Sequence, residues 1–244
     1  DVGQLECLMG RYGEAQRYLV ESLAIAREVE DTRMVAAVLQ PLGWASLGQG
    51  DLAAARAHFA EALDLAHQLG NKHELAAVLN ALAQLHRLEG DPDTAEPLYE
   101  KVVALARELG DRESIAIGLL NLAMVSISRG SGARAGRMLL EVFAIAEEIG
   151  SKPAGQSVLE VSAGLASSSK EWERAARFFG MAEAQTEQTG LHRDPADEAF
   201  LAPLITKTRN VLGAEAFASA EAVGRALTYE EAAAEARAWL ENGC

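Results

Sequence analysis

The side chains that could carry out chemistry are too scattered in this sequence to form a known metal-binding motif. Zinc sites on helices place two histidines four residues apart, which brings both to one face. No such pair and no histidine–cysteine cluster occurs among the five histidines, which are His58, His67, His73, His86 and His192. The two cysteines, Cys7 and Cys244, have no partner at motif spacing, which is typical of a reducing compartment.

Catalytic motifs are absent in the same way. The sequence contains no G-x-S-x-G elbow, no G-x-x-x-x-G-K phosphate loop and no Ser/His/Asp order typical of a triad. Adjacent acids such as Glu147 and Glu148 are typical of solvated helix faces. We therefore expect a protein that is not an enzyme, with no catalytic residues, no metal site and no cofactor.

The elements that would position a binding residue repeat every 40 residues. The first of three columns of residues at this spacing is small: Ala15, Ala55, Ala95, Ala135 and Ala175. The second is mostly large and apolar, with Leu19, Phe59, Tyr99, Leu139 and Phe179, and the third is small again, with Gly43, Ala83, Ala123 and Ala163. A fixed period of this size indicates stacked supersecondary units, each burying its apolar face against its neighbours.

Helix boundaries can be read from glycines spaced 20 residues apart. Glycine falls at positions 10, 50, 70, 90, 110, 130, 150 and 190, and is missing from the series at Glu30 and Lys170. A glycine just past a helix closes its C-terminus, and a polar residue can then cap the next helix. Suitable caps follow these stops: Asp31, Asp51, Asn71, Asp91, Asp111, Ser131 and Ser151. Because residues 166–170 read ASSSK, we expect a looser turn there.

These signals predict an all-α fold, a right-handed α-solenoid of antiparallel helix hairpins. About five hairpins occupy residues 1–190, the first of them truncated, and capping helices follow over 191–244. Asp194 and Pro195 begin the first capping helix, and Thr228 with Glu231 forms a capping box for the last, over 229–241. In the truncated hairpin, Val2, Leu5 and Met9 would expose an apolar edge. Either upstream repeats cover this edge or two copies of the chain meet there as a homodimer.

Composition narrows the range of partners. The net charge is −14 and the pI about 4.8, so the surface should repel phosphate backbones and anionic membranes. No apolar run approaches the roughly 20 residues of a membrane span, and no signal peptide is visible. We expect a cytoplasmic protein with no direct nucleic-acid or membrane contact.

The repeating units resemble tetratricopeptide repeats. The matching features are a leucine followed by a small residue in the first helix (Leu42-Gly43, Leu82-Ala83), Gly-Asp before the second helix, and a small residue four positions before an aromatic one (Ala55 to Phe59, Ala95 to Tyr99). The usual period of that repeat is 34 residues, so both helices are longer here. The resemblance implies a protein-interaction fold.

The long repeats and the C-terminal segments 172–184 and 212–236 are similar to the ends of large bacterial LuxR-type regulators and their signal-transduction ATPase relatives. This resemblance implies a non-catalytic sensing module at the C-terminus of a transcriptional regulator or signalling ATPase. A free-standing scaffold or chaperone-like adaptor is the alternative.

In such arrays the first helix of each hairpin lines the concave surface, where a protein, a peptide or a small inducer would bind. One stripe on these helices has spacings of 3 or 4 residues, which keep it on one helical face. We refer to its ten candidate binding residues as the stripe: Gln40, Trp44, Leu47, Asn80, Gln84, Arg87, Leu120, Met124, Ile127 and Glu160. With equal weight, the same face could be solvated or could pack between neighbouring hairpins.

Overall fold

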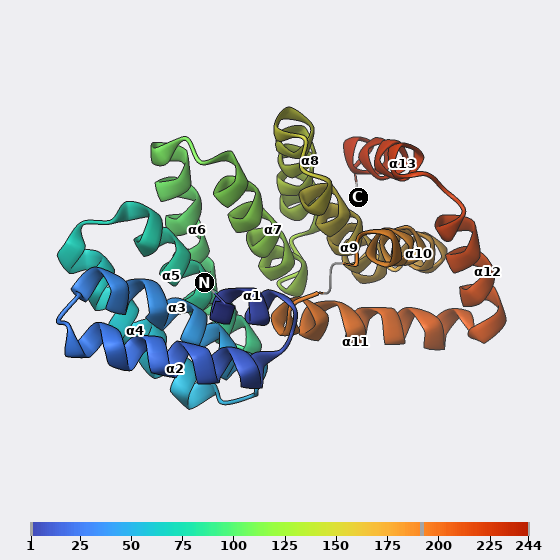
Figure 1. The fold of residues 1–244 in the computed structure, drawn as a ribbon. Coiled ribbons are helices and arrows are strands. Elements are labelled where there is room, and N and C mark those ends of the chain that lie inside the picture. The colour runs from blue at the N-terminus through green and yellow to red at the C-terminus, as the bar shows by residue number, and fades with distance from the viewer. Residues whose placement is uncertain (1, 191–192, 244) are drawn as a thin grey trace. The chain divides into compact units, whose positions relative to one another are not determined.

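The computed structural model describes residues 2–190 and 193–243, which form thirteen helices and no strand. The chain divides into two compact units, residues 1–110 and 111–244. The all-α class and the arrangement in stacked helical hairpins are confirmed in each unit (Figure 1). The predicted boundary between repeats and cap, at 190/191, falls beside residues outside the described part of the chain and stays a prediction.

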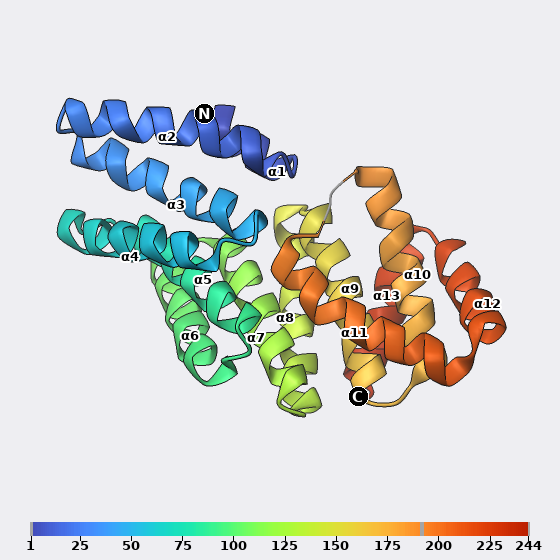
Figure 2. The same cartoon turned by 90° about the horizontal axis from the view of Figure 1, so that it is seen from below.

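The first unit consists of three hairpins. Within each pair the two helices contact one another, and α2–α3 and α4–α5 contacts join neighbouring pairs (Figure 2). The helices are α1 (Val2–Leu8), α2 (Tyr12–Glu28), α3 (Thr32–Gly48), α4 (Leu52–Leu69), α5 (Lys72–Leu88) and α6 (Pro92–Leu109).

The second unit contains two hairpins followed by three further helices. Its elements are α7 (Arg112–Ser128), α8 (Gly132–Ile149), α9 (Lys152–Ser168), α10 (Trp172–Thr189), α11 (Pro195–Leu212), α12 (Ala214–Arg225) and α13 (Tyr229–Glu241). Helices α11 and α13 lie on opposite sides of the α9–α10 hairpin, and α12 packs against α10 (Figures 1 and 2).

The small and large columns of the sequence form the core. Ala15, Ala55 and Ala95 are fully buried, as are the larger Leu19, Phe59 and Tyr99 that follow them by four residues. A side chain at Gly43 of α3 would collide with the ring of Phe59 of α4, so a glycine there permits close approach within the hairpin.

Side-chain caps begin most of the helices as predicted. Asp31, Asp51, Asn71, Asp91, Asp111 and Ser151 each accept a hydrogen bond from the backbone N–H three residues on. The capping box of Thr228 and Glu231 and the N-cap Asp194 are also present. Ser131 stands at the N-cap of α8 but makes no side-chain capping bond, so there the expectation is wrong.

The turn expected to be looser is the same as the others. Lys170 adopts the left-handed conformation with φ 63°, and Glu30 does so with φ 55°. The Lys170 N–H donates to the Ser167 carbonyl at 3.1 Å and the Glu171 N–H to Ala166 at 2.9 Å, which matches the pattern at Gly50 and Asp51. Tertiary packing therefore imposes one turn geometry even where glycine is missing.

Two close contacts anchor the C-terminal helices. A side chain at Gly180 of α10 would collide with the Glu221 carbonyl of α12, and one at Gly224 of α12 with the Arg177 carbonyl of α10. The two glycines thus let the α10 and α12 backbones touch directly. On the other side of the hairpin, Phe178 of α10 packs edge-on against Trp239 of α13, with ring centroids 5.2 Å apart.

Candidate functional site

The structure places the stripe partly inside the protein. None of its ten residues is in the exposed class. Six are buried, namely Leu47, Gln84, Leu120, Met124, Ile127 and Glu160, and the other four are half-buried, namely Gln40, Trp44, Asn80 and Arg87. In the first unit, therefore, the half-buried four on α3 and α5 are the most accessible of these side chains.

Trp44 shows why part of the stripe is covered. Its indole packs edge-on against Phe59, with ring centroids 5.6 Å apart, and borders the core cluster that includes Val78 and Leu85 of α5. It contributes to packing between hairpins while keeping part of its surface accessible. Whether the stripe binds a ligand stays a prediction.

A second candidate surface consists of six of the large apolar side chains that the first hairpin exposes, three from each arm. We refer to these as the first-hairpin face: Val2 and Leu5 of α1 with Met9 just after it, and Tyr18 and Ile25 of α2 with Val29 just after it. Their spacings of 3, 4 and 7 residues keep each set on one side of its helix. The apolar edge expected from the sequence is therefore exposed.

The position of Leu5 shows how unusual this exposure is. Leu5 is 58% exposed, whereas the residues 40, 80, 120 and 160 positions later are at most 1% exposed, namely Ala45, Leu85, Val125 and Leu165. In α3 and α5 these positions belong to helices that pack on the hairpin before them. Leu5 thus lies on a stacking surface of α1 with no described hairpin on it, whereas the residue equivalent to Val29 stays exposed in a later hairpin, as Leu69 shows.

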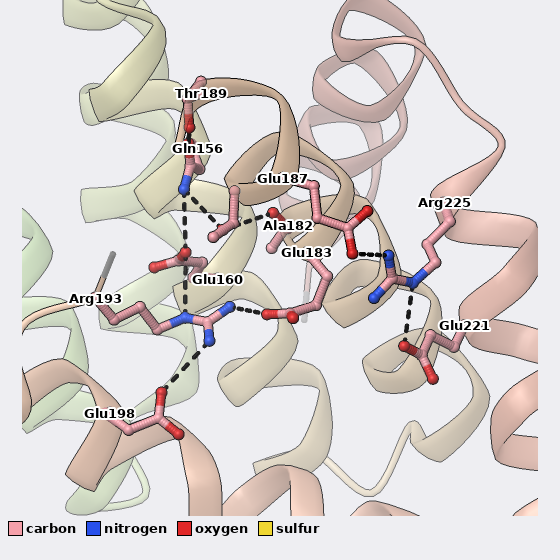
Figure 3. Close-up of polar contacts among 11 residues, drawn as sticks. Gln156, Glu160, Ala182, Glu183, Glu187, Thr189, Arg193, Glu198, Glu221 and Arg225 are labelled. Carbon is pink, nitrogen blue, oxygen red and sulfur yellow. Dashed lines mark hydrogen bonds and ion pairs between the residues drawn. The ribbon is translucent and has the colours of Figure 1, made fainter. Parts of the chain in front are cut away.

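A third candidate is a buried charged cluster in the second unit, centred on Arg193 in the connection between α10 and α11 (Figure 3). Its Nη2 donates to Glu183 of α10, and its Nη1 donates to Glu198 of α11 at 3.4 Å. Its Nε lies 3.2 Å from Oε1 of Glu160 on α9, but the N–H does not point at that oxygen. Three helices therefore direct carboxylates at one guanidinium.

Burial decides the electrostatics of this cluster. Removal from water raises the pKa of Glu160 to about 7, because the charged form is poorly solvated. Arg193 and the Gln156 amide, whose Nε2 lies 3.5 Å from Oε1 of Glu160, oppose the shift without cancelling it. Glu183 and Asp197 add to the rise through repulsion. Glu160 therefore titrates close to neutral pH.

Sequence reasoning placed Glu160 in the stripe but did not find the other members of the cluster. Arg193 lies where the 40-residue period has ended, so no repeat position pointed to it. One signal was available: Glu160 is a carboxylate where the equivalent residues are Gln40, Asn80 and Leu120. A charge in a column of uncharged residues indicates a partner specific to that position.

Within residues 2–190 and 193–243, no three His, Cys, Asp or Glu side chains come together in a way that could hold a metal ion. Cys7 is half-buried, its Sγ lies 3.5 Å from the Pro41 carbonyl oxygen, and burial raises its pKa to about 11. Such a thiol is a poor nucleophile at neutral pH. His192 and Cys244 lie outside the described residues.

Comparison with known proteins identifies the repeats. Two overlapping stretches, residues 1–68 and 47–108, match the family model described as Tetratricopeptide repeat. Residues 1–108 are tetratricopeptide repeats. The stripe residues on α3 and α5 and the whole first-hairpin face lie within them. A search of the curated proteins finds no match.

Solved structures extend the likeness in fold beyond the matched tetratricopeptide repeats. BtubC (BKLC) from P. vanneervenii superposes with a TM-score of 0.59 at 23% identity, covering 96% of this chain and 93% of that one. Two structures of a putative kinesin light chain of Podosopora anserina, one of them a point variant, have nearly identical TPR-like repeats. Both give a TM-score of 0.52, at 18% and 17% identity, and cover 86% of this chain and 92% and 93% of theirs. At these identities the likeness concerns the fold alone.

Membrane insertion has no candidate among the described helices. None of the helices in residues 2–190 and 193–243 has both the length and the apolarity needed to cross a bilayer.

Proposed function

We propose that this chain is a protein-interaction scaffold and that a second copy of the chain docks on its first-hairpin face. The observation that carries the proposal is the 58% exposure of Leu5 at a position that is buried in every later hairpin. Contiguous exposed apolar side chains of this kind mark interaction surfaces.

A second copy suits this face because the face is apolar on both sides of a central point. Two α2 helices that meet antiparallel about a two-fold axis beside Ser22 would set Tyr18 of one copy opposite Ile25 of the other. Such an isologous contact uses one patch twice and closes at two copies, the commonest arrangement among oligomers.

Sedimentation velocity over a concentration series tests the proposal. The wild-type chain is expected to pass from monomer to dimer, and Leu5→Glu is expected to weaken the dimer at least about tenfold, since a charge would be buried without a partner. Val211→Glu is the matched control, because Val211 is 54% exposed on α11 and lies outside the face. A wild-type chain that stays monomeric, or an equal effect of both substitutions, would contradict the proposal.

The half-buried stripe residues on α3 and α5 are the second candidate surface, for a peptide or a partner's helix. Gln40 and Asn80 supply amides that can pair with a peptide backbone, and Trp44 and Arg87 are residue types enriched where binding energy concentrates. A small inducer is the other ligand class that we propose for this surface.

For the parent protein we propose a cytoplasmic regulator of the LuxR type or a signalling ATPase, in which ligand binding to the repeats biases an upstream switch. Support comes from the sequence resemblance of segments 172–184 and 212–236, not from the solved structures. A free-standing scaffold or adaptor is the alternative. The open reading frame around this sequence distinguishes them, since a phosphate-loop ATPase encoded upstream would favour the regulator.

A further inference from the structure

Helix α11 covers the part of α9 that carries the last stripe residue. A side chain at Gly164 would lie 2.8 Å from the Phe200 ring, so α11 sits directly on α9 there. One helical turn further on, the Ser167 hydroxyl donates to the Leu204 carbonyl at 3.0 Å, and the buried Thr208 hydroxyl donates to Ser167 at 2.9 Å. These contacts involve no ionisable group, so their strength does not depend directly on pH.

Carboxylates come close to α9 at the start of α11, while Lys207 near its other end lies over the Trp172 ring of α10. Asp194 caps the helix by accepting hydrogen bonds from the N–H groups of Ala196 and Asp197, at 2.8 and 2.9 Å. Arg193 therefore sits one residue from a fixed helix start. Its side chain is 13% exposed and that of Glu160 is 10% exposed, so the pair is largely removed from water. Because Arg193 directly precedes the N-cap of α11, α11 cannot leave α9 without moving the Arg193 guanidinium.

The cluster holds more negative than positive charge. Arg193 provides one positive charge, against carboxylates from Glu160, Glu183 and Glu198, with Asp197 acting on Glu160 from α11. Among the described residues, no group of α7, α8 or α13 is among those that shift Glu160. Buried like charges cannot all ionise cheaply, so the least solvated carboxyl holds its proton to a higher pH than usual.

We propose that Glu160, Arg193, Glu183 and Glu198 form a proton-dependent latch that holds α11 on α9. With Glu160 neutral, Arg193 binds the two remaining carboxylates and α11 stays docked. Ionisation of Glu160 places a buried negative charge beside Arg193, which already binds Glu183 and the more exposed Glu198, and weakens docking. Release of α11 uncovers Gly164 and Ser167 of α9, and with them the surface around Glu160. The latch lies in the second unit and does not depend on the proposed dimer.

The direction of the pH dependence follows from proton binding. In the docked state the pKa of Glu160 is about 7, whereas a solvated glutamate has its ordinary pKa of 4.5. Between these two pH values the docked state binds more protons than the undocked state. Docking therefore weakens as the pH rises from about 4.5 to about 7, and its strength is constant at higher pH. With these two values, the docking equilibrium falls about tenfold between pH 6 and pH 8.

Hydrogen–deuterium exchange of the full chain tests the latch. Protection of the α11 amides, corrected for intrinsic exchange rates, is expected to fall about tenfold from pH 6 to pH 8 in the wild type, with α4 amides as the internal reference. Glu160→Gln is expected to show no such fall. The matched control is Glu187→Gln. Glu187 is an exposed carboxylate of α10 that pairs with Arg225 of α12, and this variant should behave as wild type.

Two results would overturn the latch. One is a Glu160→Gln chain whose α11 protection falls with pH as in the wild type. The other is a carboxyl-carbon NMR titration of Glu160 in the wild-type chain with a midpoint at the ordinary value for glutamate. The titration needs no substitution, so it decides the question even if Glu160→Gln fails to fold.

Discussion

Two residues, Glu30 and Lys170, hold a left-handed backbone conformation that glycine holds at the equivalent turns. For a residue with a Cβ this conformation costs about 1–2 kcal/mol. The turn at Lys170 keeps its shape because the hydrogen bonds to Ser167 and Ala166 and the packing of α9 on α10 fix both ends. The strain is therefore local and removable.

Lys170→Gly is expected to raise the free energy of unfolding by about 0.5–1 kcal/mol, because relief of the steric cost exceeds the extra chain entropy of glycine. Urea denaturation followed by circular dichroism measures it. Lys170→Ala is the control and should give no gain, since alanine keeps the Cβ. An equal gain for both variants would locate the effect in the lysine charge instead.

At the same scale, Glu160 shows what sequence can and cannot reveal. The spacing predicts Glu160 in the stripe, but its burial at 8% exposure beside Arg193 was not predictable, because no repeat position indicated Arg193. Leu120, Met124 and Ile127 are also buried. Spacing fixes which residues share a helical face, but whether that face meets solvent or another helix depends on packing across the array.

At the scale of elements, α10 and α12 approach so closely that their backbones touch, in addition to the side-chain contact of Phe179 with Phe217. Gly180 and Gly224 each face a carbonyl group of the other helix. Backbone cannot move aside as a flexible side chain can, so this pair of helices has little tolerance for added volume.

Gly224→Ala is therefore expected to lower the free energy of unfolding by about 1–3 kcal/mol, since the new methyl group would meet the Arg177 carbonyl. Gly13→Ala in α2 is the matched control. Nothing lies within 4 Å of its Cβ position, so higher helix propensity should raise stability by up to about 1 kcal/mol. Thermal unfolding measures both variants, and we expect a lower midpoint for Gly224→Ala and a higher one for Gly13→Ala. A lower midpoint for both would mean that the α10–α12 contact is not the cause.

Elements were the most predictable level of this structure. Alternating glycine stops and polar caps indicated the helix starts at Asp31, Asp51, Asn71, Asp91 and Asp111 because these signals are local. The α10–α12 contact was not predictable, since Gly180 and Gly224 lie 44 residues apart and Gly224 lies beyond residue 190, where the period has ended. Contacts between distant, non-repeating segments leave no spacing signal.

For the molecule as a whole, binding on the stripe needs two hairpins at once. Trp44 lies on α3 and Arg87 on α5, so a ligand that touches both depends on the stacking within the first unit. The net charge of −14 favours ligands with basic side chains and makes their binding sensitive to salt.

The double substitution Trp44→Ala with Arg87→Ala is expected to reduce recovery of binding clones from a displayed peptide library at least about tenfold, through loss of aromatic and guanidinium contacts. Exchange protection of α3 and α5 monitors folding, because Trp44 also packs on Phe59. Val223→Ala, an exposed apolar truncation in α12, serves as the control. Undiminished recovery by a folded double variant would remove the stripe as a ligand surface.

The closing turn has a consequence for how such a chain changes length. Each helix from α3 to α8 is followed by a left-handed glycine, in the series Gly50 to Gly150, with a polar residue directly after it. The turns between successive helices are thus interchangeable. Duplication or loss of a whole forty-residue repeat leaves the turns between the helices unchanged, so a gene of this kind can gain or lose repeats without needing a new type of turn.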